Sequence, residues 1–404
     1  MKKNFQLVGW ALYDFSNTIF SAVVLTFYFP LYLTSLTHRN LNLGIATSLA
    51  MVLAGLVVPW LGALSDRTGK TKAYLIATTL FCIAFTALLS QFNSVPFLMG
   101  NFLLACFFFH ASLVFYFALL PVVSGPATQG FASGLGTALG YLGVLFAIPI
   151  AHVVDLFFGR RYVFLVAAVL FLVFSLPLFF WVPERKVENP ISPSFKLLLT
   201  QWLGVFKTMG RIQKNSVVLF FFLGNFFVME AMNTVIFWMV VYLARVYNLP
   251  QFSLITVFLG LNFAAFLFGF AAGFLTDRWG SEKTLLAAVG AFFMTLWGLV
   301  LARDYRIFVA LCLTGGAFGL AGNWTAARKR VIELVPEEEI GEYFGLYNLT
   351  TKISVTSSLV FSILADRLGF RWALLSQLIP SGAGLVFLWL SRISRRNASP
   401  YPSS

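Results

Sequence analysis

Charged side chains are scarce in this chain, since only 11% of its 404 residues are Asp, Glu, Lys or Arg. In ordinary soluble domains, charged residues make up roughly a quarter of the sequence. Hydrophobic residues make up 59% of the chain and include 47 Phe, and the mean hydropathy is +0.85. The interior of a domain of this size is too small to hide so many apolar side chains from water. The composition therefore excludes a soluble globular protein and indicates that lipid surrounds most of the chain.

The chain also lacks the residue patterns of metal sites and of common catalytic sites. Its three cysteines, Cys82, Cys106 and Cys312, lie in separate apolar runs without Cys-x-x-Cys spacing, which is typical of small buried side chains. No His-x-x-x-His pair or Gly-x-Ser-x-Gly is present. Gly69-Lys70-Thr71 imitates the end of a phosphate-binding loop, but the glycine required five residues earlier is missing. We therefore expect neither an enzyme nor an ATP-driven pump, and no metal or other cofactor.

Long apolar runs dominate the chain instead. A membrane-spanning helix needs about 20 mainly apolar residues, and charged or Pro/Gly clusters divide the chain into twelve runs that are long enough. These lie near residues 7–35, 42–64, 73–91, 95–120, 129–151, 162–182, 215–243, 252–275, 284–302, 307–327, 342–364 and 372–391. We predict an all-α polytopic membrane protein with twelve transmembrane helices.

The net charge of +13 is explained by membrane topology rather than by nucleic-acid binding, because the cations sit in short clusters between apolar runs. If the N-terminus is cytoplasmic, 19 of the 28 Lys and Arg residues fall on the cytoplasmic side and 8 on the other, with Lys352 inside a span. This excess predicts that both termini are cytoplasmic. We expect a bacterial-type inner membrane, no nucleic-acid partner and a monomer.

Two halves of the chain resemble each other. Asp14-Phe-Ser-Asn17-Thr18 in the first span matches Glu230-Ala-Met-Asn233-Thr234 in the seventh. The loop after the second span of each half matches as well: Gly62-Ala-Leu-Ser-Asp66-Arg67-Thr-Gly69-Lys70 corresponds to Gly273-Phe-Leu-Thr-Asp277-Arg278-Trp-Gly280. Parallel repeats of this kind build many secondary transporters, with the substrate site between the halves. We predict an N-terminal six-helix bundle at 1–183, a cytoplasmic linker at 184–214 and a C-terminal six-helix bundle with a short tail at 215–404.

The doubled loop motif resembles the signature of the major facilitator superfamily, Gly-x-x-x-Asp-Arg-x-Gly, and occurs here in the expected loop of each half. Within that superfamily the chain resembles the small family of the yeast autophagy-related vacuolar amino-acid effluxer and its bacterial relatives. The segments that carry this likeness are Trp10-Ala-Leu-Tyr13-Asp14-Phe-Ser-Asn17, Gly140-Tyr141-Leu-Gly143, and Pro336 followed by Phe344-Gly345-Leu-Tyr347. The seventh span has Glu230-Ala231 where that family usually has Asp-Gly.

The resemblance to the superfamily implies two pseudo-symmetric bundles and a cytoplasmic gate that locks the halves when the cavity faces outward. The implied gate residues are Gly62, Asp66, Arg67, Gly69 and Lys70, with Gly273, Asp277, Arg278 and Gly280 as their counterparts. From the residues themselves, Gly69 permits a backbone turn, Asp66 can cap the helix that follows, and Arg67 can reach an acid across the cytoplasmic face. The alternative is that both loops are only tight turns that obey the positive-inside bias.

Ionisable residues within the spans are candidates for function, because a charge in hydrocarbon is costly unless it faces water or a partner. Asp14 and Asn17 share one face of the first span, and Glu230 and Asn233 share one face of the seventh. By the resemblance, spans one, four, seven and ten line the cavity, so both stripes would face it. Each carboxylate could bind a solute amine or carry a proton, because dehydration favours its neutral form. Alternatively, each only forms hydrogen bonds between helices.

Two further residues could take part in coupling. Lys352 lies at a depth similar to that of Glu230 and could pair with it, or its side chain could extend toward water. His110 could relay protons because imidazole titrates near neutral pH, or it could be satisfied structurally. Glycines in the fifth span, including Gly136, Gly140 and Gly143, permit close helix approach and would fit the interface between the halves.

These observations predict a secondary transporter that works by alternating access and is coupled to protons. Its predicted partners are protons, the bilayer and a small polar solute; by resemblance an amino acid is the first choice, and efflux is the direction. A transporter of amphiphiles such as lysolipids is the alternative in the same class, which the Phe content permits. A membrane receptor or scaffold that does not transport is the alternative in another class.

Overall fold

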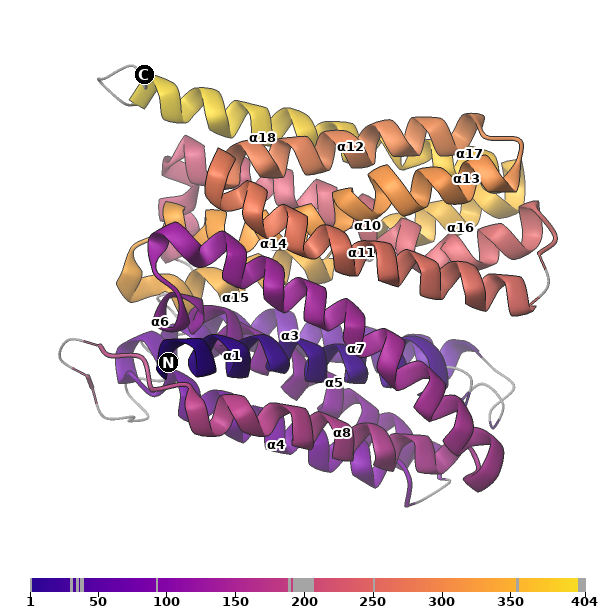
Figure 1. The fold of residues 1–404 in the computed structure, drawn as a ribbon, viewed down its shortest axis with the longest axis horizontal. Helices are drawn as coiled ribbons and strands as arrows, with labels where there is room; N and C mark the ends of the chain where they lie inside the picture. The colour runs from indigo at the N-terminus through magenta and orange to yellow at the C-terminus, as the bar shows by residue number, and fades with distance from the viewer. Residues whose placement is uncertain are drawn as a thin grey trace. The chain divides into compact units, whose positions relative to one another are not determined.

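The computed structural model describes residues 2–398 except 30–31, 34–35, 37–39, 92–93, 188–189, 192–206, 250 and 354–355. Within these residues the chain is helical and has no β-strand. Figure 1 labels the main elements. The first part of the chain forms α1 (Lys2–Ile19), a π-helical segment η1 (Phe20–Tyr28), α3 (Asn40–Thr68), α4 (Thr71–Leu88), α5 (Val95–Ala118), α6 (Leu120–Val123), η2 (Pro126–Thr128), α7 (Gln129–Phe158) and α8 (Arg160–Trp181).

The second part is also helical. It comprises α10 (Ser216–Val246), α11 (Gln251–Trp279), α12 (Ser281–Leu301), α13 (Tyr305–Leu311), the π-helical η3 (Cys312–Gly316), α14 (Ala317–Leu334), η4 (Glu337–Glu339), α15 (Ile340–Ile353), α16 (Thr356–Leu368), α17 (Phe370–Ser376) and α18 (Leu378–Ala398). Ten of the described helices are long and apolar enough to cross a membrane. The two other predicted spans fall on α3 and on α15 with α16. The prediction of an all-α polytopic membrane protein is confirmed.

The chain divides into two compact units. Unit 1 contains residues 1–202 and 335–349, and unit 2 contains residues 203–334 and 350–404. Residues 335–349, which include the start of α15, therefore pack with the N-terminal part of the chain. The predicted division into bundles at 1–183 and 215–404 stays a prediction, and 192–206 of the predicted linker lie outside the described residues.

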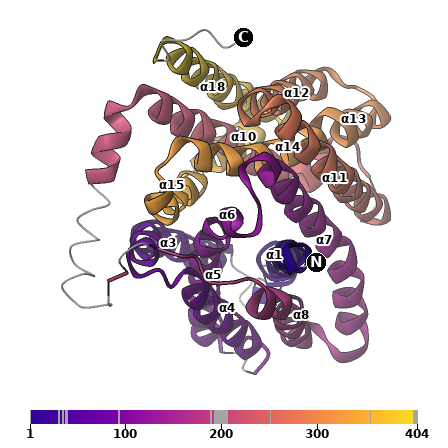
Figure 2. The same cartoon turned by 60° about the vertical axis from the view of Figure 1, so that its left-hand side comes forward.

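In unit 1, α1 packs against both α7 and α8, and Figure 2 views it nearly end-on with these helices beside it. Glycines let the backbones approach. A Cβ added to Gly143 on α7 would lie 2.6 Å from the Phe15 carbonyl oxygen of α1, and one added to Gly140 would lie 2.9 Å from Thr18 Oγ1. The prediction that this glycine stripe serves the interface between the halves is therefore wrong for these residues. They receive α1 of their own unit, because only a helix face without side chains admits another helix so closely.

This packing predicts the effect of a single methyl group. Gly143→Ala places its Cβ against backbone, which has little room to shift, so we expect the free energy of unfolding to fall by about 1–3 kcal/mol. Gly100→Ala on α5 is the matched control, because no heavy atom lies within 4 Å of a Cβ added there. Thermal unfolding of both variants in the same detergent measures the difference. Equal melting temperatures for the two variants would contradict the close approach of α1 and α7.

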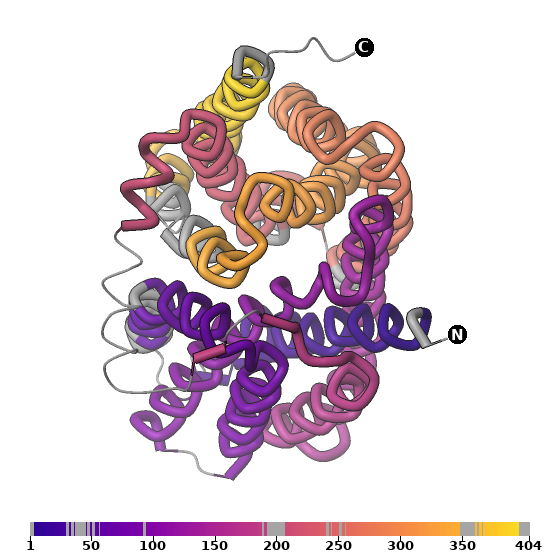
Figure 3. Tube along the Cα trace, turned by 90° about the vertical axis from the view of Figure 1, so that its left-hand side faces the viewer, coloured from indigo at the N-terminus to yellow at the C-terminus, as the bar shows by residue number. Residues whose placement is uncertain are grey.

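In unit 2, α10 and α18 form the most extensive helix pair, and Figure 3 shows them running side by side. Gly384 of α18 lies against α10, since an added Cβ would be 2.5 Å from Val228 Cγ2. Ser391 Oγ donates to the Val217 carbonyl oxygen at 2.7 Å, which ties the last turns of α18 to the start of α10. The basic end of α18 is thereby held in a defined position within unit 2.

Candidate functional site

The acid of the first span lies inside unit 1. Asp14 is only 5% exposed, and its Oδ1 accepts a hydrogen bond from Asn17 Nδ2 at 3.2 Å. Thr18 Oγ1 donates to the Asp14 carbonyl oxygen at 2.7 Å. The predicted stripe of Asp14 and Asn17 thus forms a local polar cluster, because residues three apart on a helix are neighbours.

Aromatic side chains and a glycine surround this carboxylate. Trp10 stacks on Tyr116 of α5 with ring centroids 4.4 Å apart, and its Nε1 donates to the Tyr116 carbonyl oxygen at 3.0 Å. A Cβ added to Gly136 of α7 would lie 3.0 Å from Asp14 Oδ2 and 3.0 Å from the Tyr116 hydroxyl. A side chain at residue 136 would crowd both groups. Because residue 136 is a glycine, the Asp14 carboxylate, the Tyr116 hydroxyl and the Trp10 ring can all lie close to the same point on α7.

The other predicted coupling residues occupy separate places. His110 is buried on α5, with its ring edge-on to Phe109 at 5.0 Å between centroids. Glu230 and Asn233 are half-buried on α10 in unit 2. Lys352 belongs to α15, and its side chain lies outside the described residues, so its pairing with Glu230 stays a prediction. The expectation that Asp14 and Glu230 face one cavity also stays a prediction.

The loop motif of unit 1 forms a polar cluster, which we call the Asp66 lock: Asp66, Arg185, and the amides of Gly341 and Glu342. Asp66 Oδ1 lies 2.6 Å from Arg185 Nη1. The same carboxylate accepts from the backbone N–H of Gly341 at 3.0 Å and of Glu342 at 2.9 Å. Arg185 also donates to the Glu337 carbonyl oxygen. The carboxylate therefore caps the N-terminus of α15, where unpaired N–H groups and the helix dipole favour an anion.

The Asp66 lock is buried and tightly packed. Burial raises the pKa of Asp66 to about 7, against the opposite influence of Arg185 and the two backbone N–H groups. A Cβ added to Gly62 would lie 2.2 Å from the Gly341 carbonyl oxygen. Gly62 is therefore required for the contact between α3 and the start of α15. Arg185 and the two backbone N–H groups stabilise the charged form of the buried Asp66 carboxylate. Removing any one of them would leave a buried polar or charged group without a partner, which is costly.

One prediction about this loop is wrong in detail. Asp66 does not cap the following helix; Glu184 does, since its carboxylate accepts from the N–H groups of Lys72 at 2.6 Å and Ala73 at 3.2 Å. Arg67 is exposed, and its predicted contact with an acid stays a prediction. The cation on Asp66 is Arg185. The predicted turn at Gly69 is confirmed by its φ of +65°, and Lys70 follows it as an exposed residue. Sequence reasoning missed Arg185 and Glu184 because both follow span six, far from the motif in the chain.

The second copy of the motif lies in unit 2 with different partners. Asp277 Oδ1 is 2.7 Å from Lys329 Nζ of α14. Arg278 is exposed, with its guanidinium carbon 6.0 Å from the centre of the Phe274 ring. Gly273 is buried, and Gly280 turns the chain with a φ of +89°. Asp277 thus forms an ion pair with α14 of unit 2, whereas Asp66 is bound by the start of α15.

Comparisons with known proteins agree with this arrangement. A family model of the Major Facilitator Superfamily matches residues 11–356 and 263–403. The chain belongs to the major facilitator superfamily. As a member it is an integral, multi-pass membrane protein and a secondary transporter of small molecules rather than an enzyme.

Individual members support the same placement. An uncharacterized protein of Aquifex aeolicus is 27% identical over 87% of both chains. The uncharacterized MFS-type transporter YxiO of Bacillus subtilis is 26% identical over 94% of this chain and 93% of its own. The crystal structure of the human organic anion transporter MFSD10 superposes with a TM-score of 0.75 at 15% identity, covering 96% of this chain and 98% of that one. This last similarity shows the fold alone.

Proposed function

We propose that this major facilitator protein exports a small polar solute, with an amino acid as the first choice, in exchange for or together with protons. The observation that carries the proposal is the enclosed Asp14 carboxylate beside Asn17, Trp10 and Tyr116. A carboxylate binds a primary ammonium group, and the aromatic faces of Trp and Tyr attract the same cation. The resemblance to the vacuolar amino-acid effluxer supports the same solute class.

In this proposal Asp14 and Glu230 are the binding or coupling acids of the two halves. Each would hold a proton while its surroundings are dry and release it when the cavity opens to water, because only water or a cation stabilises the charged form. Asn17 and Asn233 would orient the acids and bond the solute. Lys352 and His110 are proposed as a switchable partner and as a proton relay, respectively.

The Asp66 lock is proposed as the gate of the transport cycle, together with Gly62, Arg67, Gly69 and Lys70. Helix α15 belongs to unit 1 up to Leu349 and to unit 2 from Thr350. Breaking the bonds between Asp66 and the start of α15 would therefore free a segment that is covalently continuous with unit 2. Asp277 and its neighbours Gly273, Arg278 and Gly280 are proposed as the counterpart gate.

Counterflow in proteoliposomes tests the solute class directly. Vesicles preloaded with one unlabelled compound are diluted into a trace of the labelled compound, using amino acids, sugars, nucleosides and lysolipids in separate assays. We expect exchange of an amino acid, and accumulation when an imposed pH gradient supplies the driving force. Exchange of lysolipids alone would replace this proposal with the amphiphile alternative, and exchange without any response to the gradient would remove proton coupling.

The orientation and location are part of the proposal. We place both termini in the cytoplasm, since 19 of the 28 Lys and Arg residues then lie on that side. The relatives from Bacillus subtilis and Aquifex aeolicus favour a bacterial inner membrane. Cysteine labelling of intact cells at an added tail residue would test this orientation, because an impermeant reagent should react only after the cells are opened.

A further inference from the structure

A cluster of basic side chains lies at one end of unit 2, close in sequence to the proposed gate residues Asp277 and Gly280. Glu282, near the start of α12, is surrounded by three arginines: Arg330 Nη2 is 2.8 Å from its carboxylate, Arg392 Nε is 3.2 Å away and Arg395 Nη1 is 3.5 Å away. Arg330 also lies 3.5 Å from Glu333. These three cations and two anions leave a net positive charge, which an anion could neutralise.

The arginines of this cluster differ in access. The Arg330 side chain is 2% exposed, whereas those of Arg392 and Arg395 on α18 are 34% and 58% exposed. A guanidinium carries five N–H donors in a planar fork that suits phosphate. Glu282 engages one nitrogen of each α18 arginine, so each keeps donors that Glu282 does not use. Glu282 therefore holds the guanidinium groups of Arg392 and Arg395 in position and leaves N–H donors on each that can bind another anion.

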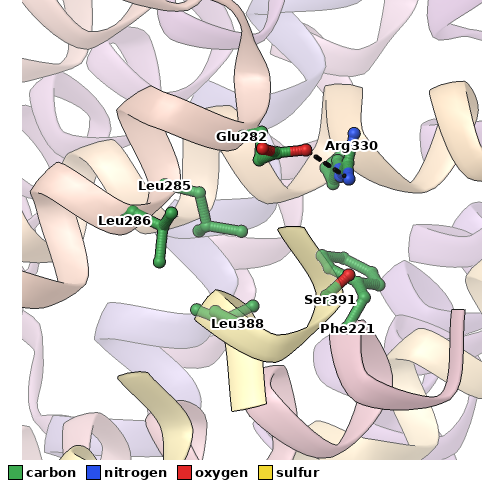
Figure 4. A pocket seen from close by; sticks show the side chains of 7 residues that line it. All are labelled: Phe221, Glu282, Leu285, Leu286, Arg330, Leu388 and Ser391. Carbon is green, nitrogen blue, oxygen red and sulfur yellow. Dashed lines mark hydrogen bonds and ion pairs between the residues drawn. The ribbon is translucent and has the colours of Figure 1, made fainter. Parts of the chain in front are cut away.

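The surroundings of Arg392 and Arg395 indicate that the bound anion is a lipid headgroup rather than a dissolved ion. Trp389 is 54% exposed and lies one turn before Arg392 on α18, and tryptophan is enriched at the level of the lipid headgroups. Figure 4 shows Glu282 and Arg330 beside Leu285, Leu286 and Leu388 in a small pocket lined mostly by buried side chains. The apolar surface open to a lipid tail is instead on α18, where Val386 is 54% exposed and lies one turn before Trp389. Val386, Trp389 and Arg392 follow one another at a spacing of three residues and therefore share one face of α18. A partly exposed arginine thus lies beside exposed apolar surface.

We propose that Arg392 and Arg395, held in place by Glu282, bind the phosphate of an anionic phospholipid whose acyl chain packs on the adjoining apolar surface. Basic pockets between membrane helices are a recurrent setting for such headgroups. Basic residues that only set membrane orientation need no fixed position, because the positive-inside rule depends on their charge alone. Here Glu282, in the N-terminal turn of α12, holds the two arginine side chains in position. The hydrogen bond from Ser391 to Val217 holds the end of α18 that carries them.

Native mass spectrometry of the full chain, titrated with phosphatidylglycerol or with phosphatidylcholine, tests the proposal. The wild type should bind phosphatidylglycerol more tightly than phosphatidylcholine. The variant Arg392→Gln/Arg395→Gln should bind phosphatidylglycerol roughly thirtyfold more weakly, and Arg395→Gln alone roughly fivefold more weakly. Because Arg395 is the more exposed residue, its single variant keeps the test decisive if the double variant fails to fold.

Two controls separate the site from general charge. Arg303→Gln/Arg306→Gln removes the same charge from exposed residues at the other end of α12 and the start of α13, and should leave lipid affinity unchanged. Arg392→Lys/Arg395→Lys keeps the charge and should restore most of the affinity. The proposal is overturned if the glutamine variants bind phosphatidylglycerol as the wild type does. It is also overturned if wild-type affinity is equal for both lipids, or if inorganic phosphate displaces the lipid at equal concentration.

Discussion

Replacing Asp66 with alanine should expose the amides of Gly341 and Glu342 and free the start of α15. The substitution removes the acceptor of two backbone N–H groups and leaves Arg185, which is 7% exposed, without its carboxylate. Breaking a buried charge pair in this way costs about 3–5 kcal/mol. We expect hydrogen exchange in the segment from Ile340 to Leu346 to accelerate by roughly 100-fold, as a loss of about 3 kcal/mol implies.

Hydrogen–deuterium exchange with peptide-level mass spectrometry checks this result, and the neighbouring arginines provide a matched pair. Arg185→Ala should accelerate exchange in the same segment, because Asp66 then becomes a buried charge without its cation. Arg67→Ala should not, because Arg67 is exposed although it is adjacent to Asp66 in sequence. If Arg67→Ala had the larger effect, or if Asp66→Ala left the protection unchanged, the Asp66 lock would not exist in solution.

Asp14→Asn should abolish the accumulation of solute that a proton gradient drives. Asparagine keeps the size of the side chain and can still accept from Asn17, so the helix packing should persist while the titratable group is lost. Truncating one partner of a buried, hydrogen-bonded charge pair costs about 2–5 kcal/mol. If Asp14 binds the solute amine, counterflow should therefore fall at least about 30-fold. If Asp14 carries only the proton, counterflow should continue while gradient-driven accumulation stops.

Asp155→Asn is the control for Asp14→Asn. Asp155 is an acid of the same unit, placed near the end of α7 and 3.4 Å from Arg160 in a partly exposed pair. Neutralising it should change both transport activities by at most about fivefold, since exposed pairs contribute about 0–1 kcal/mol. Accumulation by Asp14→Asn at the wild-type rate would contradict the role of Asp14. Glu230→Gln, measured in the same assays, tests whether the acid of the second half is also needed for accumulation or for counterflow.

Several local features of the fold were predictable because they depend on neighbours along one helix. The pairing of Asp14 with Asn17 follows from their spacing of three residues, which places them on one helical face. The turn at Gly69 follows from the conformational freedom of glycine, and its φ of +65° agrees. The apolar runs predicted the helices, because backbone groups in lipid must bond within their own segment.

The partners of Asp66 were not predictable in this way. Its carboxylate meets Arg185 and the amide of Gly341, which lie 119 and 275 residues further along the chain. The loop motif identifies an acid near a helix end, but two helix starts could use it, α4 and α15. Glu184 occupies the first of these, which leaves Asp66 for the second.

The amino-acid sequence by itself determined that this protein is a helical membrane protein, that it is duplicated, and that few charges lie within its spans. These properties follow from hydropathy and helical period, which act over a few turns of one segment. Only the tertiary structure decided that the start of α15 joins unit 1, that the glycines of α7 receive α1, and that Glu282 gathers three arginines. Such contacts depend on which helix faces pack together. They join residues that are far apart in the sequence, so no pattern within one segment predicts them.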